Sequence, residues 1–202
     1  MFTALSMTGA ESHGNVRSRD RPSTTPDARL GVYPGSFNPP TVAHLEIALT
    51  AREHHGLHRV DFAVSTITLG KESVMRPPFE ERLAVIEASI ADVDGLGLIV
   101  TEHQLIADIA GGYDVVVMGA DKWAQVNDVA WYPDHAARDA ALAALPALAL
   151  APRTGFDVPD EHALPVGAEL LDVSSSAVRA GRTEWMTDAA RRHHEATGAW
   201  AP

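Results

Sequence analysis

The chain has 202 residues and a formal net charge of −11 at pH 7. This length suits one domain with a substantial core, and the acidic balance excludes broad, non-specific nucleic-acid binding, which needs a basic surface. The sequence contains no cysteine, which excludes disulfides, thiolate catalysis and cysteine-ligated metal sites. No apolar run approaches the roughly 18 residues of a membrane span, and no signal-peptide pattern opens the chain. We therefore expect a cytoplasmic protein that neither crosses membranes nor binds nucleic acid.

The first segment of the chain, residues 1–28, is rich in Ser, Thr, Pro, Arg and Asp and has little apolar surface to bury. Hydrophobic burial would not offset the entropy lost on ordering such a segment. We predict a disordered tail over residues 1–28 and one folded domain over residues 29–202.

Apolar runs of strand length alternate with helical patterns along the folded part. The predicted strands are 30–34, 59–65, 96–101, 114–118, 147–151 and a short sixth at 169–173. The predicted helices are 42–55, 78–90, 104–110, 136–145, one that begins within 174–176, and 188–197. Buried strands separated by helices indicate an α/β fold with a doubly wound parallel sheet of five to six strands, helices on both faces and a helical C-terminal segment. Ligands of such sheets bind at the carboxyl ends of the strands.

The most informative stretch is residues 31–44, Gly-Val-Tyr-Pro-Gly-Ser-Phe-Asn-Pro-Pro-Thr-Val-Ala-His. Its order predicts a strand, a tight loop and a helix whose first N–H groups are exposed, an arrangement that suits phosphate. Thr41 and His44 are three residues apart, so they share one face of the first helical turn. The loop matches neither the P-loop spacing nor the GxGxxG spacing.

A second candidate site combines three consecutive serines, Ser174, Ser175 and Ser176, with Arg179 one helical turn later. One interpretation is a plain helix N-cap followed by a surface arginine. The other is an anion cradle of N–H, O–H and guanidinium donors. The residues alone leave both open.

Together these segments resemble the nucleotidylyltransferase superfamily. Residues 35–44 are similar to its GSFxPxT/HxGH motif, with Ala43 in place of the usual Gly, and residues 173–179 are similar to its ISSTxxR segment. The resemblance implies a Rossmann-like nucleotidylyltransferase domain over residues 29–202. It also implies nucleotidyl transfer from a nucleoside triphosphate, with Mg²⁺ delivered bound to ATP.

The resemblance also implies roles for the motif residues. His44 and Thr41 would hold the α-phosphate, and His44 would stabilise the charge that develops as pyrophosphate leaves. The serines and Arg179 would bind the β- and γ-phosphates. The Gly/Pro loop, with Gly35, Ser36 and Phe37, would line the nucleotide site.

A lysine and an arginine further along the chain fit the same resemblance. Lys71, followed by Phe79-Glu80-Glu81-Arg82-Leu83, is similar to the family's lysine loop and (E/D)-R-L helix start. The lysine would contact the phosphates or the acceptor.

The middle of the chain resembles the nicotinate-mononucleotide adenylyltransferase branch. Residues 118–121 (Met-Gly-Ala-Asp), 130–132 (Ala-Trp-Tyr) and 150–155 (Leu-Ala-Pro-Arg-Thr-Gly) are similar to its GAD…WY…R(P)G pattern. The resemblance implies acceptor binding by Arg153 and stacking of Trp131 on a pyridine ring, with Trp123 as the competing tryptophan. Gly119 and Asp121 would line the nucleotide site.

The acceptor stays open at this point, because residues 100–109 are shorter than the equivalent segment of that branch. Adenylyl transfer to nicotinate mononucleotide is the first candidate. Adenylyl or cytidylyl transfer to another phosphorylated acceptor such as phosphopantetheine is the second. A catalytically weak nucleotide-binding sensor is a third reading, and a homo-oligomer is also open. The histidines at 54, 55, 58, 193 and 194 match no zinc spacing, so we expect no protein-bound metal site.

Overall fold

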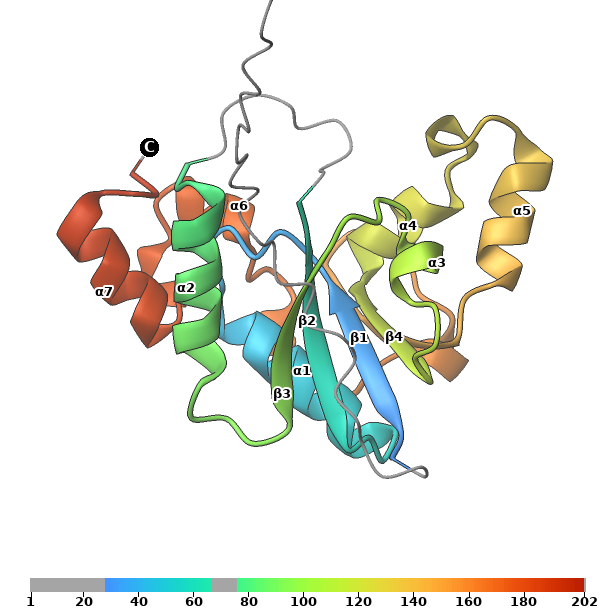
Figure 1. Cartoon of the computed structure of the whole chain (residues 1–202), viewed down its shortest axis with the longest axis horizontal. Helices are drawn as coiled ribbons and strands as arrows, with labels where there is room; N and C mark the ends of the chain where they lie inside the picture. The colour runs from blue at the N-terminus through green and yellow to red at the C-terminus, as the bar shows by residue number, and fades with distance from the viewer. Residues whose placement is uncertain (1–27, 67–75, 202) are drawn as a thin grey trace, which may run out of the picture.

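The computed structural model describes residues 28–66 and 76–201. Its centre is one parallel sheet of five strands: β1 (Leu30–Pro34), β2 (Arg59–Ser65), β3 (Leu96–Thr101), β4 (Val115–Gly119) and β5 (Ala147–Ala151). In Figure 1, β3, β2, β1 and β4 follow one another across this sheet. The strand order is β3-β2-β1-β4-β5. The winding direction reverses between β1 and β4, so the loops after these two strands flank a crevice at the carboxyl edge of the sheet. The predicted Rossmann-like α/β fold is confirmed.

Helices cover both faces of this sheet. The helices are α1 (Val42–His54), α2 (Phe79–Ile90), α3 (Ile106–Ile109), α4 (Ala120–Asn127), α5 (His135–Ala143), α6 (Ser175–Arg179) and α7 (Asp188–Thr197). Short 3₁₀ turns are η1 (Val129–Trp131), η2 (Asp160–His162), η3 (Ala168–Leu170) and η4 (Thr183–Trp185). Side chains of α1 and α2 pack on one face of the sheet, and those of α3, α4 and α5 pack on the other. The C-terminal helix α7 lies against α2 (Figure 1).

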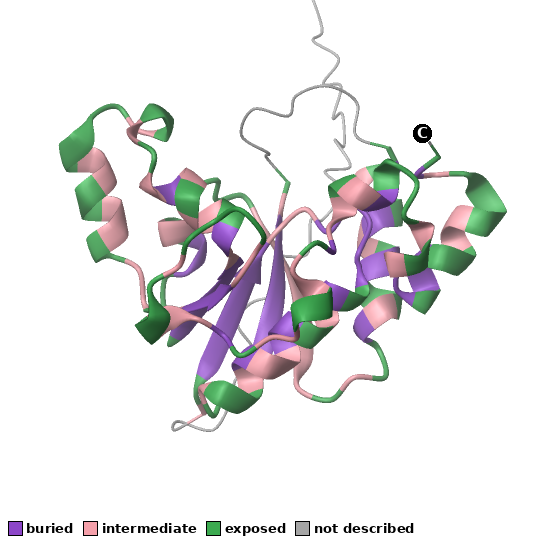
Figure 2. Cartoon of the chain, turned by 180° about the vertical axis from the view of Figure 1, so that it is seen from behind, coloured by how far each residue is buried: buried purple, intermediate pink, exposed green. Residues whose placement is uncertain are grey.

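Alternation along the strands divides the core between these two faces. In β4, Val115 and Val117 face the α1 side, whereas Val116 and Met118 face the α4 side. This is the period of two expected of a strand that is buried on both faces. Figure 2 accordingly shows the middle strands of the sheet as buried.

The structure differs from the sequence-based prediction at one strand and one helix. The predicted sixth strand at residues 169–173 is wrong, because Ala168–Leu170 form η3. The backbone N–H of Leu164 donates to the carbonyl of Leu150 in β5 at 2.8 Å, so the chain itself occupies that edge of the sheet before residue 169. Helix α4 was not predicted as an element, although it begins directly after β4.

The remaining helices lie where the sequence placed them, with α3 shortened from 104–110 to Ile106–Ile109. The predicted disordered tail lies outside the described residues, except for its last residue. Within the two described ranges, no helix has both the length and the apolar character that crossing a membrane requires.

Candidate active site

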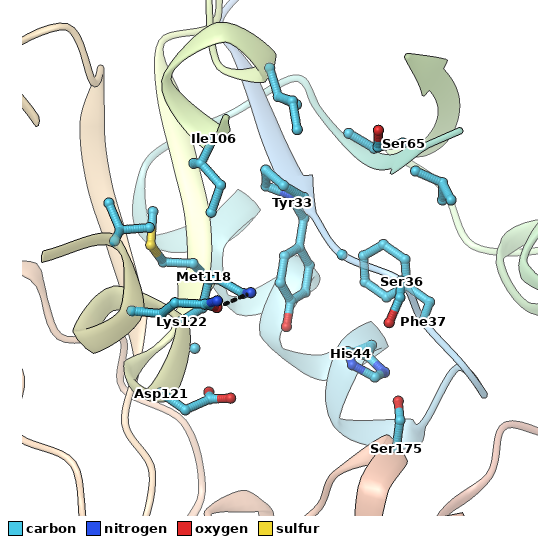
Figure 3. A pocket seen from close by; sticks show the side chains of 18 of the residues that line it. Tyr33, Ser36, Phe37, His44, Ser65, Ile106, Met118, Asp121, Lys122 and Ser175 are labelled. Atoms are coloured by element: carbon cyan, nitrogen blue, oxygen red, sulfur yellow. Dashed lines mark hydrogen bonds between the residues drawn. The ribbon is translucent and has the colours of Figure 1, made fainter. Parts of the chain in front are cut away.

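A cavity of about 670 Å³ opens at the carboxyl edge of β1 and β4. It collects most of the residues that the sequence selected: Gly35, Ser36, Phe37, His44, Gly119, Asp121, Trp131, Arg153, Ser174, Ser175, Ser176 and Arg179. In Figure 3, Ser36, Phe37, His44 and Ser175 lie on one side of the cavity, Asp121 and Lys122 lie on the other, and Tyr33 lies between them.

Packing of the Phe37 side chain shapes the loop after β1. Phe37 has a φ of 43°, in the left-handed region, and its buried ring lies 4.7 Å from the ring of Phe62, between centroids. A Cβ on Gly35 would lie 2.8 Å from Cζ of Phe37, so only glycine fits beneath that ring. A left-handed non-glycine residue costs about 1–3 kcal/mol, and burial of the aromatic ring offsets this cost.

His44 is held in one tautomer by the start of α1. Its Nδ1 accepts a hydrogen bond from the Thr41 backbone N–H at 2.9 Å and lies 2.8 Å from Thr41 Oγ1. Because Nδ1 accepts, the hydrogen of the neutral ring is on Nε2. Burial, with a smaller contribution from the charge of Arg153, lowers the pKa of His44 to about 3. At neutral pH the ring is therefore an uncharged N–H donor at the cavity wall.

Thr41 lies behind His44 and not in the cavity wall. Its side chain is fully buried, and it is not among the residues that line the cavity. The sequence predicted a direct contact between this hydroxyl and phosphate, whereas the structure directs it to the histidine ring.

The second motif contacts the first motif directly. Ser175 Oγ donates to the carbonyl of Pro39 at 2.7 Å, and the guanidinium of Arg179 donates to the carbonyl of Asn38 and, at 3.2 Å, to Ser176 Oγ. Ser174 is the N-cap, since its Oγ accepts from the Ala177 N–H at 3.1 Å. The plain helix-cap interpretation therefore describes Ser174, whereas Ser175 and Arg179 join α6 to the loop after β1.

An ion pair between Asp121, which follows β4, and Arg153, which follows β5, forms the opposite wall of the cavity. Arg153 Nε lies 3.1 Å from Asp121 Oδ1, and Arg153 Nη2 donates to the carbonyl of Val173 at 2.9 Å. A Cβ on Gly119 would lie 2.6 Å from Asp121 Oδ1. Glycine at this position therefore lets the carboxylate reach Arg153.

The two candidate tryptophans differ in position. Trp131 is 43% exposed and lines the cavity. Trp123 packs instead against the buried residues under α3, α4 and α5. Trp131 is thus the tryptophan whose side chain a ligand in the cavity can reach.

Sequence reasoning gave no role to several lining residues, among them Tyr33, Lys122 and Gln125. Lys122 Nζ donates to Gln125 Oε1 at 2.5 Å, as the dashed line in Figure 3 marks. The i, i+3 spacing of this pair would have placed both side chains together once α4 was known to be helical. Lys71, the predicted phosphate or acceptor contact, lies outside the described residues.

The cavity is locally basic although the chain is acidic overall. Arg82, Lys122, Arg153 and Arg179 line it, and Asp121 is the carboxylate among its described lining residues. Across residues 28–66 and 76–201, no cluster of three or more His, Asp or Glu side chains is arranged to hold a metal ion. The lining thus suits an anionic ligand.

Curated relatives fall into two groups. A protein from Geobacter sp. (strain M21) named "Probable nicotinate-nucleotide adenylyltransferase" is 30% identical over 122 residues, which are 54% of this chain and 55% of that protein. A phosphopantetheine adenylyltransferase from Rhizorhabdus wittichii is 32% identical over 93 residues, 45% of this chain and 53% of that protein. The chain spans about half the length of each.

Solved structures share the fold at low sequence identity. Nicotinic acid mononucleotide adenylyltransferase of Plasmodium falciparum, complexed with NaAD, superposes with a TM-score of 0.60 at 11% identity. The alignment covers 86% of this chain and 97% of that enzyme. The structure of the same enzyme complexed with APC gives a TM-score of 0.59 at 12% identity.

A family model described as cytidylyltransferase-like matches residues 32–181. This range holds β2 to β5, all of β1 except its first two residues, the loop after β1, the Asp121–Arg153 ion pair and α6. The chain belongs to the cytidylyltransferase-like family of nucleotidyltransferases.

Proposed function

We propose that this protein transfers the adenylyl group of ATP to a phosphorylated small molecule, nicotinate mononucleotide first among the candidates, and releases pyrophosphate. One observation carries the proposal: the loop after β1 and α6 are joined by hydrogen bonds around His44 in a basic cavity. Family membership supports the reaction type, and the names of the relatives support adenylyl transfer.

The reaction is an in-line displacement. A phosphate oxygen of the acceptor attacks the α-phosphorus of ATP, the new P–O bond forms, and the bond to pyrophosphate breaks. No side chain acts as a nucleophile. The protein contributes positioning and charge stabilisation, which dominate catalysis of phosphoryl transfer.

Each residue has a role that follows from its position. His44 donates its Nε2–H to the α-phosphate, and Thr41 orients the histidine ring through Nδ1. Ser175, Ser176 and Arg179 face the β- and γ-phosphates, and Ser175 and Arg179 also hold the loop. Mg²⁺ enters as part of the substrate Mg-ATP, because Asp121 is already paired with Arg153 and the described lining offers no set of metal ligands.

The part of the cavity wall that Trp131 forms favours a flat heterocycle as the acceptor. Trp131 presents its half-exposed indole there, and aromatic faces stack on planar rings. The names of the Geobacter relative and the Plasmodium structure support a pyridine mononucleotide. The name of the Rhizorhabdus relative supports phosphopantetheine as the second candidate.

The deciding experiment is an acceptor panel. The full chain is incubated with Mg-ATP or Mg-CTP and nicotinate mononucleotide, nicotinamide mononucleotide or phosphopantetheine, and released pyrophosphate is measured. We expect release with ATP and nicotinate mononucleotide. Activity with phosphopantetheine alone would replace the acceptor, and tight ATP binding without any release would make the protein a nucleotide sensor.

A further inference from the structure

Tyr33 is a buried tyrosine whose hydroxyl points into the cavity. Its side chain is 6% exposed, and Figure 3 shows the hydroxyl directed toward the space between His44 and Asp121. The ring is fixed by Phe37 and Phe62, whose centroids lie 5.3 and 5.6 Å away. The direction of the hydroxyl is therefore set by packing.

The other two tyrosines satisfy their hydroxyls within the protein. Tyr113 donates to Asp61 Oδ2 at 3.0 Å, and Tyr132 donates to the carbonyl of Val126 at 3.0 Å. In the described part of the chain, no protein group forms such a bond with the Tyr33 hydroxyl. Among the described residues, the Tyr33 oxygen is not one of the buried polar atoms without a partner. The hydroxyl therefore opens to the cavity, where a bound ligand can accept a hydrogen bond from it.

The surroundings of Tyr33 indicate what that partner is. Burial raises the pKa of Tyr33 above its ordinary value, and the nearby carboxylate of Asp121 raises it further while Arg153 opposes the rise. The hydroxyl therefore stays protonated and can donate. The His44 ring, itself a donor, has its centroid 6.1 Å from that of Tyr33. Two neutral donors that face one basic cavity suit the oxygens of a single phosphate group.

We propose that the Tyr33 O–H donates a hydrogen bond to a phosphate oxygen of the bound substrate, at the same phosphate that His44 contacts. This inference rests on the proposed function, in which that phosphate is the α-phosphate of ATP. Tyr33 is then a substrate-contacting residue of the reaction, additional to the two sequence motifs.

The test is Tyr33→Phe in the full chain, which removes the oxygen and keeps the ring. We expect kcat/KM for pyrophosphate release to fall about ten- to a hundredfold, the range for a hydrogen bond to a charged group. The thermal midpoint should stay equal or rise, because no protein hydrogen bond is lost.

Tyr113→Phe is the matched control, with the opposite expected result. Tyr113 bonds to the buried Asp61 and does not line the cavity, so this variant should lower the thermal midpoint and leave kcat/KM unchanged. The proposal is overturned if Tyr33→Phe keeps kcat/KM within about twofold of the wild type, or if its thermal midpoint falls as that of Tyr113→Phe does.

Failure of the proposed function gives a separate result. If the wild type releases no pyrophosphate with any acceptor, calorimetric titration with Mg-ATP still decides the role of Tyr33. A loss of affinity of tenfold or more in Tyr33→Phe supports the phosphate contact, and equal affinity overturns it.

Discussion

The indole Nε1–H of Trp200 donates a hydrogen bond of 2.6 Å to Oδ1 of Asn38, 162 positions earlier in the chain. Asn38 also donates from Nδ2 to the carbonyl of Arg76 at 3.2 Å, and its own carbonyl accepts from Arg179. Trp200 is 2% exposed and packs among Val85, Val178, Met186 and Ala190. The C-terminal segment thus anchors the loop after β1.

Trp200→Phe should destabilise the protein more than the loss of ring volume predicts. The change leaves Oδ1 of Asn38 buried without that donor, at a cost of about 1–3 kcal/mol. Urea unfolding measures the loss. Trp185→Phe is the control, because Trp185 is only partly buried and its ring contacts the guanidinium of Arg182. Equal losses of stability in the two variants would contradict a structural role for the hydrogen bond.

His44→Ala should lower kcat by about a hundredfold or more, the order expected when one charge-stabilising donor is removed, with a much smaller change in ATP affinity. Thr41→Val should cost less, because the backbone N–H of residue 41 still holds Nδ1. Steady-state kinetics and ATP titration distinguish the two effects. Normal turnover with weakened ATP binding in His44→Ala would assign His44 to binding alone.

Protonation of His44 should make the folded state sensitive to acid. The folded pKa of about 3 lies below the usual value near 6.5 of an unfolded histidine. Below pH 6.5 the unfolded chain therefore binds the proton first, and the stability present above pH 6.5 is lost progressively as pH falls toward 3.

The measurement compares the wild type with His44→Gln by urea unfolding at pH 7.5 and pH 5.5. Over this interval the wild type should lose about 1 kcal/mol more than the variant, since one pKa unit corresponds to about 1.4 kcal/mol and part of the ring faces the cavity. Parallel losses in both proteins would show that His44 titrates normally.

Arg179→Ala should weaken ATP binding more than AMP binding, because AMP has no β- and γ-phosphates. Some loss for both nucleotides is expected, since Arg179 also holds the carbonyl of Asn38. Calorimetric titration of both nucleotides gives the ratio of wild-type to variant affinity for ATP and for AMP. The control Arg182→Ala removes an exposed arginine that pairs with Glu184 and does not line the cavity, so both affinities should be unchanged. An equal loss for ATP and AMP in Arg179→Ala would place this side chain away from the terminal phosphates.

Trp131→Ala should raise the KM for nicotinate mononucleotide and leave the KM for ATP unchanged. One stacking platform contributes about 1–3 kcal/mol, which corresponds to roughly five- to 150-fold. Trp123→Phe is the control and should affect stability without changing either KM, because Trp123 packs against the core and does not line the cavity. A change in KM for Trp123→Phe and none for Trp131→Ala would reverse the assignment.

The sequence predicted the sheet and both motifs because these signals are local. Strands such as Val115–Gly119 are continuous apolar runs, and the loop of Gly, Ser and Pro before α1 follows β1 directly in the sequence. Helix α4 escaped prediction because it is short and mostly polar: of its eight residues, only Ala120 and Val126 are buried. The sixth strand was predicted wrongly from the apolar residues Leu170, Leu171 and Val173. Their pattern does not show that Leu164 already occupies the free edge of β5 through its hydrogen bond to Leu150.

The directions of side chains were beyond sequence reasoning. The motif placed Thr41 at the start of α1, but only the packing of the folded chain shows that its hydroxyl faces His44. The same holds for Tyr33, which read as a strand residue like its neighbours. Its hydroxyl reaches the cavity because the rings of Phe37 and Phe62 leave the tyrosine one direction to point.

The hydrogen bonds from Ser175 and Arg179 to the carbonyls of Pro39 and Asn38 have a consequence for protein engineering. Because both acceptors are main-chain atoms, the fit depends on the backbone path of the loop and not on its side chains. A loop with a different backbone path would move these two carbonyls away from their donors. Under the proposed function, exchanges that alter nucleotide selectivity should therefore move residues 35–41 and 174–179 as one unit, whereas exchanges around η1, which carries Trp131, should alter acceptor selectivity alone.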